Sequence, residues 1–212
     1  MNIGILDYGA GNLRSVYRAV NHLGFEYTKV SSSSDFDCLD KLIIPGVGAF
    51  RVAMEQLHDN NLVNSVKKYS SSGMPIMGIC LGMQLLFSRS SEFGNAKGLD
   101  IIKGSILHIR DQYQKAYDNR INVPHVGWSS LESYADDVIF EAIDKAPLDC
   151  YFVHSFMACN VPDENILAVI DYCGLKIPAA VRVKNTYGLQ FHPEKSGPEG
   201  LKMIKNFLEH RF

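Results

Sequence analysis

Residues 75–87 read Pro75-Ile76-Met77-Gly78-Ile79-Cys80-Leu81-Gly82-Met83-Gln84-Leu85-Leu86-Phe87. The apolar residues after Pro75 predict a short buried strand, and the leucines after Cys80 have the spacing of a helix. Gly78 and Gly82 flank Cys80 in the G-x-C-x-G pattern of a nucleophile elbow, with a thiol in place of the hydroxyl. Glycine suits such a strained turn because it has no Cβ to clash, and the start of a helix favours the thiolate. The alternative is that Cys80 is a small core residue.

A second stretch, residues 187–196, supplies a matching base. Leu189 and Phe191 alternate with Gln190, which predicts a strand that ends at His192. Glu194 follows two residues later, as a carboxylate that orients a histidine base would. A surface His-Pro-Glu turn is the alternative for this tripeptide alone. The strand-end histidine and the elbow taken together favour a catalytic triad of Cys80, His192 and Glu194.

Strands and helices alternate over the first hundred residues. Strands are expected at 3–6, 26–30 and 42–44, and helices at 13–23, 49–58 and 60–71, with Asn12 as a cap. This order predicts an α/β fold with a flavodoxin-like, doubly wound, mainly parallel sheet. Denser strands follow at 101–109, 119–126, 150–154, 166–172, 178–184 and 187–191. They predict an antiparallel extension within one domain spanning 1–212, with helices near 135–144 and 198–210 and Ser-rich loops at 31–34, 70–72 and 88–91.

Composition indicates which partners and which cell compartment to expect for this chain. It has 212 residues and a formal net charge of −2, which does not favour binding to nucleic acid or an anionic membrane. No signal peptide or membrane span is expected. The five cysteines show no C-x-x-C spacing, which indicates a reducing compartment without structural zinc. We therefore expect a cytoplasmic protein with no metal and no organic cofactor.

Glycine loops follow two of the expected parallel strands. Gly9-Ala10-Gly11 lacks the third glycine of a dinucleotide fingerprint, since Arg14 stands in its place, so nucleotide binding is disfavoured. The loop at 46–48 follows the third strand, where a backbone N–H of Val47 or Gly48 can face the thiol. With the N–H of Leu81, this predicts an oxyanion hole, and a plain Pro-Gly turn is the alternative.

Several blocks resemble a known family. Residues 78–84 and 190–194 are similar to the two signature blocks of class I (triad-type) glutamine amidotransferases. Within that family, residues 7–12, 45–50, 123–128 and 151–156 resemble the glutaminase subunits of imidazole glycerol phosphate synthases. The resemblance runs from residue 2 to the C-terminus and is weakest over 109–122.

The resemblance implies roles for further residues. The implied glutamine-binding residues are Gly46, Gln84, His154, Ser155 and Phe156. Those implied to face a partner are Asn12, Trp128, Tyr151 and Lys195. His125, inside one of the matching blocks, is assigned no chemistry.

The resemblance also implies hydrolysis of glutamine to glutamate and ammonia. The ammonia would pass to a separate (β/α)8-barrel cyclase subunit, in a heterodimer that makes imidazole glycerol phosphate for histidine biosynthesis. Three alternatives remain open. They are a paralogue that supplies ammonia for amidation of a surface-polysaccharide sugar, a cysteine hydrolase on the same fold, and an inactive regulatory subunit.

Overall fold

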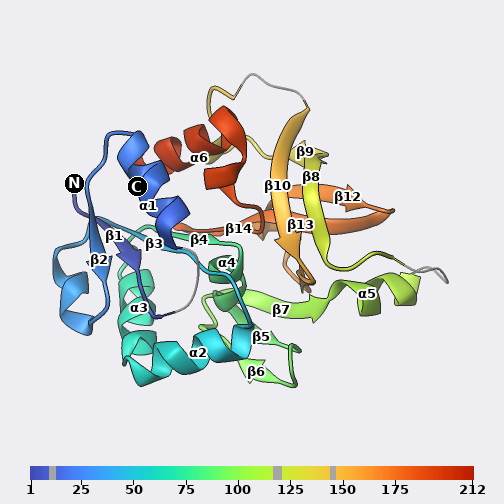
Figure 1. Cartoon of the computed structure of the whole chain (residues 1–212), viewed down its shortest axis with the longest axis horizontal. Coiled ribbons are helices and arrows are strands. Elements are labelled where there is room, and N and C mark those ends of the chain that lie inside the picture. Colours follow the sequence, from blue (N-terminus) through green and yellow to red (C-terminus); the bar gives the residue numbers. More distant parts are fainter. Residues whose placement is uncertain (10–12, 117–120, 144–146) are drawn as a thin grey trace.

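The computed structural model describes residues 1–9, 13–116, 121–143 and 147–212, built around an eight-stranded sheet (Figure 1). Its strand order is β2-β1-β3-β4-β14-β13-β12-β9. The first five strands are parallel: β2 (Tyr27–Val30), β1 (Ile3–Leu6), β3 (Lys41–Ile44), β4 (Ile76–Ile79) and β14 (Thr186–Leu189). The last three are antiparallel: β13 (Leu175–Val183), β12 (Ile166–Tyr172) and β9 (Ser133–Tyr134). The parallel part has the flavodoxin-like order, so the predicted fold class and its antiparallel extension are confirmed.

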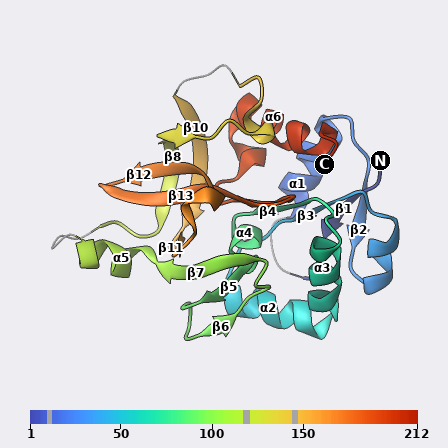
Figure 2. The ribbon, with the colours of Figure 1, turned by 180° about the vertical axis from the view of Figure 1, so that it is seen from behind.

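Helices cover both faces of the parallel strands. Helices α1 (Leu13–His22) and α6 (Gly197–Glu209) lie on one face, and α2 (Phe50–Asp59), α3 (Leu62–Ser71) and the short α4 (Leu81–Leu85) on the other (Figures 1 and 2). Alternate residues along the strands pack into two separate hydrophobic cores. Ile43 and Met77 pack on the α1–α6 side, whereas Leu42 and Ile76 pack on the α2–α3 side. This is why the buried strands read as continuous apolar runs.

Two smaller sheets extend from the parallel strands. An antiparallel ribbon pairs β8 (His125–Leu131) with β10 (Leu148–His154). A four-stranded sheet has the order β11-β7-β5-β6, with bounds Phe156–Cys159, Ile102–His108, Phe87–Ser90 and Ala96–Lys97. Helix α5 (Ile109–Ala116) follows β7, and 3-10 turns cover Ser33–Cys38, Val138–Phe140, Asp163–Asn165 and Pro193–Lys195. The ribbon and β11 bring residues 153–156 over the elbow.

The expected helix near 135–144 is wrong. Within the described part of this range there is only the 3-10 turn Val138–Phe140, and Ala142 has a positive φ of 52°. Tertiary contacts override the local pattern, because the Asp137 carboxylate accepts from the Ile139 N–H and pairs with Arg182. The Asn206 side chain also donates to the Ile139 and Glu141 carbonyls.

Three other expected segments differ in the structure. The strand expected at 119–126 begins only at His125, since Pro124 has no N–H for a ladder. The Ser-rich loop expected at 88–91 is mostly strand β5, and the one at 31–34 runs into a 3-10 turn. Helix α4 has only five residues, because Phe87 already begins β5. The proposed cap of α1, Asn12, lies outside the described residues.

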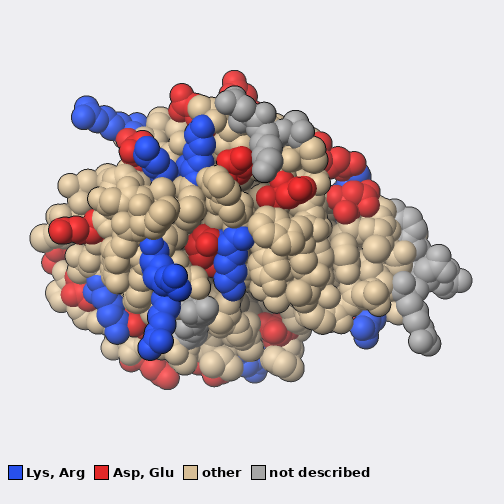
Figure 3. All heavy atoms as spheres, turned by 45° about the horizontal axis from the view of Figure 1, so that its top comes forward, with Lys and Arg blue, Asp and Glu red and all other residues tan. Residues whose placement is uncertain are grey.

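The surface carries no dominant charge on the face that is drawn in Figure 3. Lys and Arg side chains alternate there with Asp and Glu, and uncharged areas separate them (Figure 3). This agrees with the net charge of −2. In the described part of the chain, no helix is both long and apolar enough to cross a membrane.

Candidate active site

Cys80 stands at a strained turn between β4 and α4. Its backbone has φ 54° and ψ −110°, a conformation that a residue with a side chain rarely adopts. The flanking glycines make the turn possible. A Cβ on Gly82 would lie 1.7 Å from the Ile44 carbonyl oxygen, and one on Gly78 would lie 2.7 Å from the Gly82 oxygen. The Cys80 N–H donates to the Leu189 carbonyl at 2.7 Å, which ties the elbow to β14.

The predicted base and its orienting carboxylate form a buried pair. His192 Nδ1 and Glu194 Oε1 are 2.8 Å apart, and both side chains are 3% exposed. The backbone around them is fixed, because the His192 N–H donates to the Tyr151 carbonyl at 2.9 Å. Ser196 Oγ donates to the His192 carbonyl and accepts from the Tyr151 N–H. Since Nδ1 is occupied by the carboxylate, Nε2 is the ring nitrogen left for chemistry.

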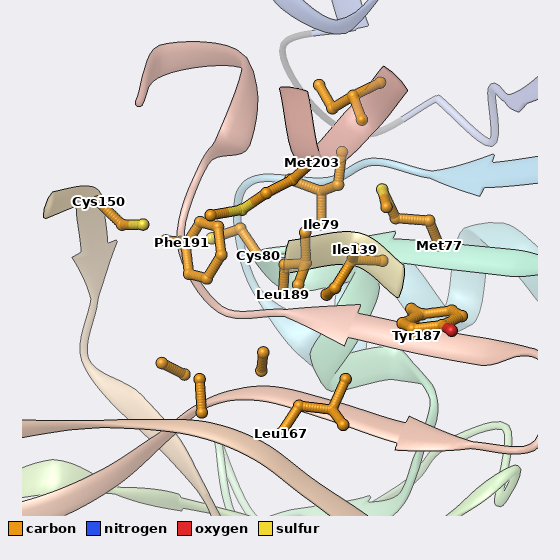
Figure 4. Close-up of a cluster of buried hydrophobic side chains, with 14 of the residues drawn as sticks. Met77, Ile79, Cys80, Ile139, Cys150, Leu167, Tyr187, Leu189, Phe191 and Met203 are labelled. Carbon is orange, nitrogen blue, oxygen red and sulfur yellow. The ribbon is translucent and has the colours of Figure 1, made fainter. Parts of the chain in front are cut away.

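The Cys80 thiol acts electrostatically on this imidazole. Burial lowers the pKa of His192, but its interactions with Cys80 and Glu194 outweigh burial and raise the pKa to about 9. Nε2 is buried and has no hydrogen-bond partner among the described residues, so it is free to exchange a proton. Figure 4 shows Cys80 packed among Ile79, Leu189, Phe191 and Met203, an apolar setting that strengthens such a charge interaction. Cys80, His192 and Glu194 therefore lie together, in an arrangement suited to proton transfer from a thiol.

The backbone donors of the expected oxyanion hole are not both available. The Leu81 N–H donates to the Gly46 carbonyl oxygen at 3.3 Å, so the loop after β3 presents an acceptor to this donor. The Tyr8 hydroxyl fixes the start of this loop by donating a hydrogen bond to the Pro45 carbonyl at 3.0 Å. Gly48 has φ 115°, a conformation open to glycine. Rotation of the Gly46–Val47 peptide would replace the carbonyl with the Val47 N–H and free Leu81.

A pocket of about 290 Å³ opens beside Cys80. Its lining consists of Val47, Gly48, Cys80, Leu81, Gln84, Glu92, Pro124, Val153, His154, Ser155 and Phe156. Four of the five residues implied to bind glutamine lie in this wall. The fifth, Gly46, does not line the pocket. A Cβ on Gly46 would come within 3.1 Å of the Leu81 Cβ.

Glu92 is a pocket residue that the sequence analysis missed. Its Oε2 accepts from the Phe50 N–H at 2.6 Å, which anchors the carboxylate at the start of α2. No motif surrounds Glu92 in the sequence, and it follows a Ser-rich run that was interpreted as a loop. Its position depends on the pairing of β5 with β7, which joins distant residues.

Three of the four residues implied to face a partner lie close together on the β8–β10 ribbon and the loop after β14. Trp128 pairs with Tyr151 across the ribbon, and their ring centroids are 6.0 Å apart. Lys195 Nζ lies 5.9 Å from the Tyr151 ring. Trp128 is 58% exposed. Asn12 lies outside the described residues.

Two histidines behave differently from expectation. His125, which was assigned no chemistry, is buried and lies 3.0 Å from His154. His108, for which the sequence analysis gave no role, is half-buried with its ring against Phe156. Within the described ranges, no group of three or more His, Cys, Asp or Glu side chains is arranged to hold a metal ion.

Comparison with known proteins identifies the family of this chain. The family model for glutamine amidotransferase class-I matches residues 4–211, and the chain belongs to this family. It is 40% identical over 207 residues to the imidazole glycerol phosphate synthase subunit HisH of Bacillus licheniformis, covering 98% of this chain and 95% of that one. It is 39% identical over 205 residues to the subunit of the same name from Chlorobaculum tepidum, with 97% and 98% coverage.

Solved structures share the fold at lower sequence identity. A crystal structure of a glutamine amidotransferase superposes with a TM-score of 0.73 at 19% identity, covering 98% of this chain and 97% of that one. The PurLQS structure from Thermotoga maritima gives a TM-score of 0.72 at 21% identity, with the same coverage. These neighbours support the class I glutamine amidotransferase fold.

The raised pKa of His192 gives a testable pH dependence. The folded-state value of about 9 lies above the ordinary value of 6.5, so between these values the folded protein holds a proton that the unfolded chain has released. This stabilising contribution is complete below pH 6.5 and is lost as pH rises through about 9. We expect the free energy of unfolding of the wild type to fall over this interval and that of His192→Gln to fall less. Denaturant titrations at several pH values measure this, and equal slopes would contradict the assignment.

Proposed function

We propose that this chain is a glutaminase, a single amidotransferase domain over 1–212 that releases ammonia from L-glutamine. The observation that carries the proposal is the buried His192–Glu194 pair beside a cysteine in a strained elbow, at the wall of a pocket large enough for an amino acid. The identity of about 40% to named subunits of imidazole glycerol phosphate synthase supports it.

Each catalytic residue has a distinct task in this mechanism. The Cys80 thiolate attacks the side-chain carbonyl carbon of glutamine and forms a tetrahedral intermediate. His192 gives its Nε2 proton to the leaving amine, so ammonia departs and a γ-glutamyl thioester remains. His192 then takes a proton from water, which attacks the thioester and releases glutamate and the thiolate. Glu194 keeps Nδ1 protonated and stabilises the imidazolium without taking the proton.

The pocket offers groups that complement an amino acid. We propose that Gly46, Gln84, His154, Ser155 and Phe156 bind glutamine, as their family resemblance implies. Glu92 adds a carboxylate, which would attract the α-ammonium group of the substrate. The pocket volume of about 290 Å³ suits a small amide substrate, which favours an amidotransferase over a peptidase.

Oxyanion stabilisation requires a rearrangement in this proposal. Val47, Gly48 and Leu81 would supply the hole after the Gly46–Val47 peptide turns, because the Gly46 carbonyl now accepts from Leu81. Loss of one oxyanion donor costs on the order of 10²–10³ in rate. The chain alone would therefore be a slow glutaminase, and contact with a partner would favour the turned peptide.

The partner that we propose is a separate (β/α)8-barrel cyclase in a cytoplasmic heterodimer. Ammonia is protonated in water, so a shielded route to a synthase subunit is needed. Both reported relatives are named as subunits of imidazole glycerol phosphate synthase, which favours histidine biosynthesis over sugar amidation. Trp128, Tyr151 and Lys195 would form the docking surface, and Asn12, which lies outside the described residues, is assigned to it by family resemblance alone. Exposed Val126 and Val153, which pair across the ribbon, extend this surface toward the pocket.

The triad assignment predicts which cysteine reacts. A glutamine-analogue electrophile should label Cys80 and spare the other four cysteines, as peptide mass mapping can show. Cys38 and Cys173 are exposed whereas Cys80 is buried, so they control for simple accessibility. Cys150 controls for burial, which raises the pKa of its thiol to about 12.

The same assignment predicts the order of mutational effects. Cys80→Ala and His192→Ala should lower kcat by a factor on the order of 10⁵–10⁶, and Glu194→Ala by about tenfold to a hundredfold less. Steady-state release of glutamate measures these losses. Full activity of Cys80→Ala, or labelling of Cys38 alone, would remove the proposed nucleophile.

Trp128 is the only tryptophan in the chain, so its fluorescence reports on docking. We expect its emission to shift when the cognate barrel subunit is added, because an exposed indole would become buried. Trp128→Ala should weaken the complex by about 2 kcal/mol or more if this side chain is a hot spot. Tyr134→Ala, which removes another partly exposed aromatic from β9, is the matched control and should change affinity little. Unchanged emission on mixing would place the partner elsewhere.

A further inference from the structure

A chain of hydrogen bonds links two buried histidines that take no part in the triad. His154 Nδ1 lies 2.8 Å from the Phe156 carbonyl oxygen, and His154 Nε2 lies 3.0 Å from His125 Nδ1. His125 Nε2 lies 2.9 Å from Ser129 Oγ. His154 and His125 are 5% and 3% exposed. This series of hydrogen bonds thus runs from the pocket wall, through the β8–β10 ribbon, to Ser129, the residue that follows Trp128.

The carbonyl group at one end of this series determines which atom donates in each hydrogen bond. A carbonyl oxygen only accepts, so His154 Nδ1 carries a proton and donates to Phe156. Burial lowers the pKa of His154 to about 3 and that of His125 to about 4, so both rings are neutral at pH 7. Neutral His154 therefore accepts at Nε2 from Nδ1–H of His125. His125 in turn accepts at Nε2 from the Ser129 hydroxyl.

The Phe156 carbonyl connects this chain to Gln84 in the pocket. Gln84 Nε2 donates to Phe156 O at 3.3 Å and to Gln190 Oε1 at 3.0 Å. Both amide protons of Gln84 are then used, so its side-chain oxygen is the free group for the pocket. Gln190 Nε2 lies 3.9 Å from the Cys80 sulfur, which places the far end of the chain at the nucleophile.

We propose that His125 is a positioning residue for glutamine: its Nδ1–H satisfies Nε2 of His154 and so stabilises the tautomer that donates to the Phe156 carbonyl, which in turn holds Gln84 with its side-chain oxygen toward the substrate. In the other tautomer, a bare His154 Nδ1 would face the Phe156 oxygen and repel it. The carbonyl would then move away from Gln84. The proposal rests on the proposed glutaminase function.

A purely structural role for His125 makes a different prediction. Its ring packs 4.2 Å from the Tyr172 ring centroid and 5.1 Å from that of Phe152. If packing alone mattered, His125→Phe would be tolerated and His125→Asn would not. If the donor matters, the ranking reverses, because the Asn side-chain nitrogen takes the place of Nδ1 and Phe offers no donor.

The experiment measures glutamine KM and kcat for the full chain and three variants. We expect His125→Phe to raise KM about 3- to 10-fold, the range for one lost neutral hydrogen bond, with kcat changed less. His125→Asn should stay within about twofold of the wild type. His108→Phe is the matched control, since His108 packs on the Phe156 ring but takes no part in the series of hydrogen bonds. The KM of this variant should not change. An unchanged KM in His125→Phe, or a larger rise in His125→Asn, would overturn the proposal.

Nitrogen-15 NMR of the imidazoles tests the same inference without turnover. The wild type should show both His125 and His154 neutral and protonated at Nδ1 at pH 7. His125 protonated at Nε2 would overturn the proposal even if glutamine is hydrolysed. Absence of glutamine turnover and binding in the wild type, with both tautomers as expected, would instead count against the proposed function.

Discussion

The close approach of the β4–α4 elbow to β3 is the constraint on which the site depends. Because Gly82 has no side chain, its backbone can lie against the Ile44 carbonyl, where a Cβ would be only 1.7 Å away. This contact lets Cys80 adopt φ 54° and point from the carboxyl edge of the sheet. Strain at a nucleophile persists only when its surroundings are rigid, and the parallel neighbours β3 and β14 provide that rigidity.

The parallel strands also explain why distant sequence blocks meet. Chain segments leaving β3, β4 and β14 emerge at one edge, so the loop at 46–48, Cys80 and His192 become neighbours. The β8–β10 ribbon closes this edge from the other side and receives the His192 N–H at Tyr151. One ribbon therefore bonds to His192, lines the pocket and carries the exposed Trp128. This arrangement gives a docking subunit a short physical route to the reacting groups.

The sequence predicted what depends on local pattern. The elbow at Cys80, the strand end at His192 and the alternating strands of the first hundred residues all carry strong periodicity or glycine signals. Features set by tertiary contacts were missed. The helix expected near 135–144 is absent from its described part because Asp137 pairs with Arg182. Glu92 and His125 acquire their positions only through strand pairing, and the Gly46 carbonyl orientation leaves no mark in the sequence at all.

The central claim is that the isolated chain holds an aligned triad beside an oxyanion hole closed by its own backbone. Amide hydrogen exchange at Leu81, followed by NMR in the chain alone and with the proposed barrel subunit, tests this most directly. The account predicts a protected Leu81 amide in the isolated chain, bonded to the Gly46 carbonyl at 3.3 Å, and loss of that protection when the partner turns the peptide. An unprotected Leu81 amide in an isolated chain that hydrolyses glutamine at its full rate would contradict it.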